Sequence, residues 1–560
     1  MNGKAWWAAA ALLLAAMAVA MVTSALGENQ TWDEGVHVVS GYTDLTLGDY
    51  RLNREHPPLA KYLAALPLLP LDLRLPLEHE SWRKGDAVMF GAVFLYRNRL
   101  PPDTMLLLAR LPMIGLALLL GLVLALWTRR RFGPVAALAA LFLYTTDPNF
   151  IAHGHYVASD AAVAFAVFLA VIAWLRWLER PGRSNAVLAG LALGLALAAK
   201  FSTLFLLALL PLLSLLYWRR TPGRFTLRGF FGGHIAALAV AVALLAAAYG
   251  PATWRTVALG KAAPLAAYTK QQNAVSRTLR WAGETFHLPA HPYLVGLNIV
   301  AAHNERGHPA YLLGEVSRRG RWPYFPVVFA VKTPTALLAA LAAGLWLWLR
   351  RLRARDREPA PFVWTALLAP PLAYFALAMA GNLNLGVRHI LPIYPFLYVA
   401  AGVALARLLR SRAWVLAALL IALQTAETAR IHPHHVAFFN TPSGGPAAAP
   451  RYLADSNVDW GQAVKQLAAW KRARGLDDLV VSYFGVTDLR YYLGRHRILE
   501  EICETCDIEK IDAVVAVSLT NLLGVYRDLP ALARLRARPP DARIGWAIYV
   551  YDLRKARGGE

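Results

Sequence analysis

The sequence predicts a polytopic α-helical membrane protein with a small C-terminal α/β domain outside the membrane. Three observations lead to this fold class: the composition, a series of long apolar segments, and a change of pattern after residue 430. Of the 560 residues, 57% are hydrophobic and only 17% are charged, and the mean hydropathy is +0.39. This balance excludes a disordered chain and an ordinary soluble protein.

About eleven apolar segments are long enough, or nearly so, to cross a bilayer as helices. The first has no convincing cleavage site after it, so we expect it to remain as a signal-anchor helix. The fifth and sixth are separated only by Lys200-Phe201-Ser202, which predicts a tight helical hairpin. The segments lie near 5–26, 104–127, 134–150, 158–178, 185–200, 201–218, 231–250, 324–349, 362–380, 390–408 and 413–430.

The net charge of +23 would suggest nucleic-acid binding in a soluble protein. Here the arginines form short clusters between alternate pairs of apolar segments, as in cytoplasmic loops. We therefore expect no nucleic-acid partner, a multi-pass protein of the inner or plasma membrane, and a cytoplasmic N-terminus. The clusters are Arg129-Arg130-Arg131, Arg180 with Arg183, Arg219-Arg220-Arg224, Arg350 to Arg357, and Arg407-Arg410-Arg412.

With this orientation the large polar segments 27–103, 251–322 and 431–560 lie outside. The same orientation places 14 of the 15 histidines, all except His234, on the outer side, so potential proton-transfer groups gather on the outer surface. The apolar stretch from Leu59 to Leu71 is broken by prolines, which favours a helix in the membrane interface over another span.

The chain divides into a membrane domain, 1–430, and an extracytoplasmic α/β domain, 431–560, with a Gly-rich linker at 444–447. An amphipathic helix is predicted at 458–474, and strands at 479–484, 513–519 and 544–551. The two cysteines, Cys503 and Cys506, form a lone CxxC without a second pair of zinc ligands. A local disulfide and two free thiols both fit this pattern.

Asp33 and Glu34 stand directly after the first apolar helix, where charge is costly unless it has a function. Adjacent helical residues point about 100° apart, so the two carboxylates rarely address one substrate. One could act as a general base while the other orients a neighbour or caps a helix. Thr31 followed by Glu34 also fits a capping box, which would make the pair a helix start.

His56-Pro57-Pro58 predicts an extended kink, and Lys61 follows near the membrane surface. An ammonium there could meet a phosphate, although a snorkelling lysine is an equal alternative.

Asp160 opens the fourth apolar segment, and His153 and His155 precede it with ligand-like spacing. A carboxylate there is expected to cap or to bind something, and a metal site is a weak alternative. Four further basic residues stand at predicted outer helix ends, where they could collect a lipid-linked phosphate or simply snorkel. They are Lys200, Lys332, Arg388 and His389.

In this order, the motifs resemble the membrane glycosyltransferases of the GT-C type, in particular glycosyltransferase family 39, the protein O-mannosyltransferase and aminoarabinose-transferase superfamily. Asp455 to Gln462 resembles a signature of bacterial members with a C-terminal soluble domain. The other segments that carry the resemblance are Asp33-Glu34, His56 to Lys61, Asp147 to Asp160, Lys200, and Gly386 to Pro392.

The resemblance implies a GT-C fold and inverting transfer of a sugar from a polyprenyl-phosphate to a hydroxyl of a protein, lipid or glycan at the outer face. By the same resemblance, Asp33 is the base with Glu34 assisting, and Asp160 positions the acceptor or sugar. Lys61, Lys200 and Arg388 would hold the phosphate. Such cations can offset the leaving-group charge without a cofactor, with a divalent metal left open. The further substrate-binding candidates are His56, His153, His155 and His389.

Two departures leave the sugar and the acceptor open. The segment 251–322 is too short for the β-trefoil insert of eukaryotic protein mannosyltransferases, and His56 stands where the aminoarabinose branch tends to have a lysine. A lipid or polyprenyl-linked substrate transporter or flippase is the alternative function. It would place charges deep within helices and show repeated broken helices, and no repeat is visible. A membrane-anchored scaffold would need far fewer spans.

Overall fold

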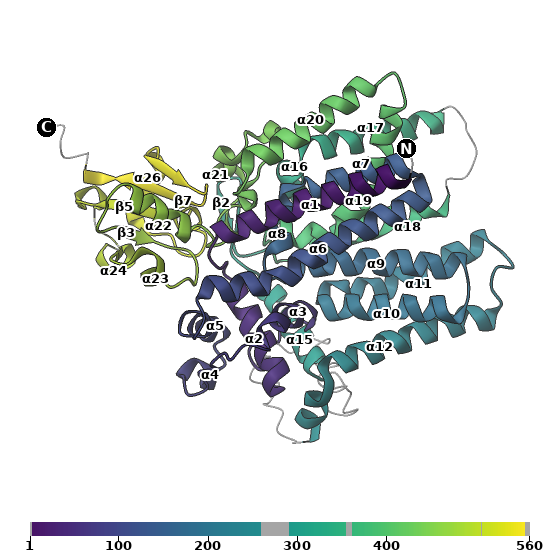
Figure 1. Ribbon diagram of the computed structural model, residues 1–560, viewed down its shortest axis with the longest axis horizontal. Coiled ribbons are helices and arrows are strands. Elements are labelled where there is room, and N and C mark those ends of the chain that lie inside the picture. Colours follow the sequence, from purple (N-terminus) through teal and green to yellow (C-terminus); the bar gives the residue numbers. More distant parts are fainter. Residues whose placement is uncertain (1–2, 259–290, 354–360, 504, 506, 555–560) are drawn as a thin grey trace.

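The computed structural model describes residues 3–258, 291–353, 361–503, 505 and 507–554. Long helices lie side by side, and a small sheet lies at one end of them, at the left of Figure 1, while the N-terminus lies towards the other end. The predicted fold class, a helical membrane protein with a C-terminal α/β part, is confirmed.

Among the described residues, eight helical segments are long and apolar enough to cross a membrane. All eight correspond to predicted segments. They are Gly3–Gly27 (α1), Pro102–Phe132 (α6), Ser159–Glu179 (α9), Phe201–Arg220 (η2 with α11), Leu227–Gly250 (within α12, Leu227–Ala258), Phe362–Ala380 (α18), Val387–Leu409 (η3 with α19) and Trp414–Ile431 (α20).

The other three predicted segments are helical but depart from a straight span. Pro134–Thr145 (α7) and Pro148–His155 (α8) meet at 64°, and Tyr324–Lys332 (α16) meets Thr335–Arg350 of α17 (Thr335–Arg353) at 107°. Arg183–Ala199 (α10) is only 17 residues long. Each bend coincides with a proline, Pro148 or Pro334, which lacks the N–H needed to continue the preceding helix.

Two of the predicted cytoplasmic clusters, those of Arg129 to Arg131 and Arg219 to Arg224, lie together near the N-terminal end of α1. The Arg129 guanidinium lies 4.3 Å from the centre of the Trp6 ring. Arg131 pairs with the Glu179 carboxylate, and Arg224 donates to the Glu179 carbonyl. These contacts agree with one common side for the basic loops.

The first outer segment forms a layer of short helices over the ends of the spans: Glu34–Leu47 (α2), Leu59–Ala65 (α3) with Leu66–Leu68 (η1), Glu80–Lys84 (α4) and Ala87–Tyr96 (α5). Helices α2 and α3 touch at Gly41, where a Cβ atom would lie 2.1 Å from the Lys61 carbonyl oxygen. A side chain at this position would force the two helices apart.

The second outer segment contributes His291–Arg306 (α15) and an antiparallel hairpin of Ala310–Leu312 (β1) and Glu315–Ser317 (β2). Part of the predicted loop 251–322, residues 259–290, lies outside the described residues.

The C-terminal sheet has the strand order β4-β3-β5-β7-β6. Its strands β4 and β5 run parallel to β3, and β7 runs antiparallel to both β5 and β6. The sheet begins only at residue 480, and its strands are Val480–Ser482 (β3), Arg497–Ile498 (β4), Val514–Ser518 (β5), Ala542–Ile544 (β6) and Ile548–Asp552 (β7). The helices around it are Val464–Ala473 (α22), Leu489–Leu493 (α23), Leu499–Ile502 (α24), Leu519–Leu522 (α25) and Pro530–Ala537 (α26).

Between α20 and the sheet, the chain runs through short turns that pack on the membrane helices. Ala437, Phe439, Leu453 and Val458 all belong to the same apolar core as the spans. The turns are His435–Ala437 (η4), Thr441–Ser443 (η5), Pro446–Ala448 (η6), Ala449–Tyr452 (α21), Asp455–Asn457 (η7) and the residues that follow to α22. The predicted helix 458–474 therefore begins six residues late. Cys506 lies outside the described residues, so the cysteine prediction stays a prediction.

Candidate active site

Asp33 lies opposite Arg388, where the start of α2 meets η3. Asp33 is the N-cap of α2, but its side chain accepts no hydrogen bond from that helix. Instead Arg388 Nη1, in η3 (Val387–Ile393), donates to Asp33 Oδ2 at 2.8 Å. The Asp33 side chain is 25% exposed, so its carboxylate combines a cationic partner with access from outside.

Asp160 brings a second carboxylate to the same arginine. Lys200 Nζ donates to Asp160 Oδ1 at 2.8 Å, and Arg388 Nη1 lies 3.8 Å from Asp160 Oδ2. The Asp160 side chain is 1% exposed, whereas those of Lys200 and Arg388 are 14% and 11% exposed. Asp33, Asp160, Lys200 and Arg388 thus form one ionic cluster, in which two cations reach towards the surface beside two carboxylates.

Imidazole rings lie beside the ionic cluster. The ring centres of His37 and His56 are 4.8 Å apart, and the Nδ1 atom of each is buried without a hydrogen-bond partner. Burial lowers the pKa of His37 to about 4 and holds the pKa of His56 well below its ordinary value. Both rings are therefore neutral at physiological pH.

Two further histidines complete these surroundings. The His153 ring, whose Nδ1 is also unpartnered, lies 5.8 Å from the Trp460 ring. His389 follows Arg388 directly and interacts electrostatically with Lys200 and Asp160.

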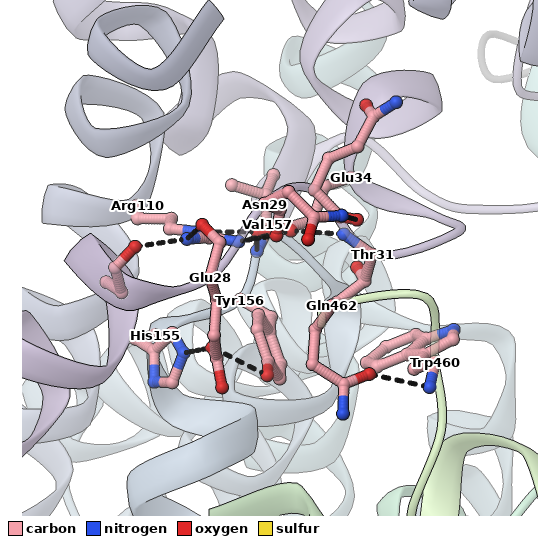
Figure 2. A network of polar contacts seen from close by, with 12 residues as sticks. Glu28, Asn29, Thr31, Glu34, Arg110, His155, Tyr156, Val157, Trp460 and Gln462 are labelled. Carbon is pink, nitrogen blue, oxygen red and sulfur yellow. Dashed lines mark hydrogen bonds and ion pairs between the residues drawn. The ribbon is translucent and has the colours of Figure 1, made fainter. Parts of the chain in front are cut away.

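Glu34 has different partners from Asp33, and Figure 2 shows the network to which Glu34 belongs. Its carboxylate accepts from Arg110 Nε and Nη2 at 2.8 and 2.7 Å, and from the backbone N–H groups of Thr31 and Val157 at 2.8 and 3.0 Å. Burial opposes ionisation of Glu34, but the Arg110 charge and these hydrogen bonds outweigh it and lower its pKa. Only half of the predicted capping box forms, because the Thr31 hydroxyl has no partner.

Arg110 was not singled out in the sequence, although a charge inside the apolar segment 104–127 is a signal for a function or a partner. Its side chain is 1% exposed. Nη1 donates to the carbonyls of Ala25 and Glu28, and Nη2 donates to that of Asn29, at 2.9, 3.3 and 2.9 Å. Arg110 thereby ties the end of α1 to the turn that presents Asp33.

His155 and His153 face different partners. His155 Nε2 lies 3.0 Å from Glu28 Oε2, which also accepts from the Tyr156 hydroxyl at 2.8 Å. Since His153 lies towards Trp460 instead, the two rings do not converge. Across the described ranges, no group of three or more His, Cys, Asp or Glu side chains is arranged to hold a metal ion.

Two predicted phosphate-binding lysines are engaged elsewhere. Lys61 Nζ lies 3.0 Å from Asp44 Oδ2 and donates to the Asn53 carbonyl, and both charged side chains are buried. Burial raises the pKa of Asp44 to about 6, against the opposing effect of Lys61. Lys332 Nζ donates to the carbonyls of Val436 and Asn457 at 2.8 and 2.7 Å. Lys200 and Arg388 are the predicted phosphate-binding cations that lie in the ionic cluster.

Comparison with known proteins places this arrangement in context. Residues 95–257 match the family model described as dolichyl-phosphate-mannose-protein mannosyltransferase, a range that includes Asp160 and Lys200. The structure is similar to ArnT from Cupriavidus metallidurans bound to undecaprenyl phosphate, with a TM-score of 0.50, 15% identity and 98% of each chain covered. The chain has the GT-C fold.

Two further solved structures are similar to this GT-C chain. The apo oligosaccharyltransferase from Archaeoglobus fulgidus is 13% identical, with a TM-score of 0.42, 94% of this chain and 72% of that chain covered. Apo ArnT from Cupriavidus metallidurans is 16% identical, with a TM-score of 0.36 and 98% of each chain covered. No curated protein matches the sequence. The family model and the similarity to ArnT bound to undecaprenyl phosphate confirm the predicted GT-C resemblance and give the transporter alternative no support.

Proposed function

We propose that the protein is an inverting glycosyltransferase that moves a sugar from a polyprenyl-phosphate to a hydroxyl acceptor at the outer face of the membrane. The observation that carries the proposal is the ionic cluster, in which the accessible Asp33 carboxylate pairs with Arg388, and Arg388 and Lys200 both lie beside the buried Asp160. The family model named for dolichyl-phosphate-mannose and the similarity to a protein bound to undecaprenyl phosphate support it.

In the proposed reaction, Asp33 takes the proton of the acceptor hydroxyl as its oxygen attacks the anomeric carbon. The bond between that carbon and the phosphate oxygen breaks on the opposite side, and its electron pair leaves with the phosphate. Inversion at the anomeric carbon follows from this geometry. Arg388 and Lys200 stabilise the charge that develops on the leaving phosphate.

The contact between Asp33 and Arg388 links donor binding to base activity. Arg388 Nη1 donates to Asp33 at 2.8 Å, and an arginine fork also suits phosphate oxygens. A phosphate that binds Arg388 competes for this hydrogen bond and leaves the carboxylate available for the acceptor proton. The donor is therefore expected to bind before the acceptor.

The side chains around the ionic cluster would orient the sugar or acceptor. Asp160 is held by Lys200, and the neutral rings of His37 and His56 each have an unpartnered nitrogen for a sugar hydroxyl. In this proposal Glu34 contributes indirectly, because it holds the turn that presents Asp33. We keep the expected location in the inner or plasma membrane and the cytoplasmic N-terminus. The donor sugar is a hexose or a pentose, and the acceptor is a protein, lipid or glycan.

The test is sugar transfer by the purified protein in lipid. Labelled polyprenyl-phosphate sugars are supplied with host membrane extract to wild type, Asp33→Asn and the control Asp49→Asn, whose partly exposed carboxylate pairs with Arg51. We expect wild type and Asp49→Asn to label an acceptor and Asp33→Asn to fail. Equal transfer by all three would reject Asp33 as base, and no transfer from any donor by folded wild type would reject the function.

A further inference from the structure

The motif Asp455 to Gln462, here called the clamp segment, contacts the loop that carries Arg388. Ser456 Oγ donates to the Leu385 carbonyl at 2.8 Å, and the Val387 N–H donates to Asn457 Oδ1 at 3.0 Å. At Gly386, whose φ is +91°, an added Cβ atom would lie 3.0 Å from both clamp side chains. The loop before Arg388 is therefore closely packed on the clamp segment.

Trp460 extends this contact to Arg388 itself. The guanidinium carbon of Arg388 lies 4.3 Å from the centre of the Trp460 ring, within the range of a cation–π interaction. The ring is 1% exposed. The N–H groups of a guanidinium donate hydrogen bonds in its own plane. The Trp460 ring contacts Arg388 without a hydrogen bond, so it restrains the guanidinium in a different way from the carboxylates.

Trp460 is itself held from several directions. The Trp32 N–H donates to its carbonyl at 3.0 Å, and its own N–H donates to Gln462 Oε1 at 2.7 Å, a contact drawn in Figure 2. The Tyr156 ring meets it edge-on at 5.6 Å. The backbone of Trp460 is thus held by Trp32 and Gln462, and its indole packs against Tyr156, the residue directly after α8, as well as against Arg388.

The chemistry of the contact suits a phosphate-binding arginine. Asp33 and Asp160 attract the guanidinium but would also repel a phosphate, whereas an indole orients it without adding a negative charge. We propose that Trp460 is a positioning residue for Arg388, so that the part of the chain after the last span completes the phosphate site. This inference rests on the proposed function for the identity of the anion.

The test uses the full chain in detergent, with undecaprenyl phosphate as the binding probe. Trp460→Leu is expected to weaken binding about tenfold, within the range of a desolvated cation–π contact, and Trp460→Phe to have a smaller effect. Trp470→Leu is the matched control, because Arg474 lies 4.6 Å from the Trp470 ring on α22. The control is expected to bind as wild type does.

A double-mutant cycle separates positioning from general damage. If Trp460 acts through Arg388, Trp460→Leu should weaken binding much less in an Arg388→Gln background, because the neutral amide makes no cation–π contact with the indole. Equal losses in both backgrounds, or no loss at all, would overturn the inference. Should Trp460→Leu fail to fold, Trp460→Phe carries the same cycle.

Binding and transfer together distinguish the two proposals. Trp460-dependent binding of undecaprenyl phosphate without sugar transfer would contradict the proposed function alone. Normal transfer and binding by Trp460→Leu would overturn the positioning role alone. Failure of wild type to bind undecaprenyl phosphate would contradict both.

Discussion

Asp33 and Glu34 are neighbours in sequence, yet each belongs to a different arginine network. The Glu34–Arg110 network is buried, and both carboxylate oxygens and the whole guanidinium have partners. The ionic cluster around Arg388 is less complete. Among the described residues near it, the polar atoms without a hydrogen-bond partner are Asp160 Oδ2 and the Nδ1 atoms of His37, His56 and His153.

This difference indicates which network is structural and which is reactive. A buried polar atom without a partner costs about 1–3 kcal/mol, so four such atoms together are unusual in a purely structural region. A polar ligand such as a sugar phosphate would satisfy them. The charged groups of the Glu34–Arg110 network all have partners, although the Thr31 hydroxyl beside them has none, and this network serves to fix the turn before Asp33.

The largest expected effect is on catalysis. Asp33→Asn removes the proposed base and should lower kcat about 10³-fold, within the range for general base catalysis. Because Asp33 is partly exposed, the thermal unfolding midpoint should change little. Transfer kinetics and thermal unfolding measure the two effects. A stable variant with near-normal kcat would contradict the assignment of the Asp33–Arg388 cluster as the reactive one.

Glu34→Gln should show the opposite pattern. It leaves the buried Arg110 charge unpaired, which typically destabilises a protein by about 3–5 kcal/mol. Glu80→Gln is the control, because Glu80 and Lys84 form an exposed pair worth at most about 1 kcal/mol. Unfolding midpoints in detergent measure both. Normal stability of Glu34→Gln combined with lost activity would instead support the assisting role that the family resemblance implies.

The buried histidines predict a pH effect on stability. The pKa of His37 is lowered from 6.5 to about 4, so between these values the unfolded chain binds a proton that the folded chain does not. Its contribution to the free energy of unfolding should therefore fall by up to about 3 kcal/mol as the pH drops from 6.5 to 4.

The difference between wild type and His37→Gln isolates this effect. Asp44, with its pKa raised to about 6, contributes with the opposite sign from about pH 4 to 6 but is present in both proteins. Unfolding measured from pH 7 to 4 should show a loss for wild type that is smaller for the variant. Parallel curves would contradict burial of a neutral His37.

The smallest expected effect separates two lysines. Lys200→Gln should weaken binding of undecaprenyl phosphate about tenfold, as for the loss of one charge-assisted hydrogen bond. Lys61→Gln should instead mainly lower stability, because it leaves Asp44 unpaired. Binding and unfolding measured on both variants test this assignment. Loss of affinity in Lys61→Gln at unchanged stability would return Lys61 to the phosphate site.

The sequence alone determined the features that depend on local pattern. All eleven predicted apolar segments are helical, because hydropathy and length decide membrane helices with little help from the rest of the chain. Asp33, Asp160, Lys200 and Arg388 were selected through motif resemblance, and the fold brings them together.

Only the tertiary structure decided how these residues are used. Arg110 engages Glu34 from 76 positions away, and Arg388 reaches Asp33 across 355 positions. Lys61 pairs with Asp44, and Trp460 contacts Arg388, because of how helices and turns pack against one another. Such packing leaves no periodic pattern in the sequence. Such partners depend on the direction in which each side chain leaves its helix and on what the fold places opposite it, so neighbouring carboxylates with similar local signals came to occupy different environments.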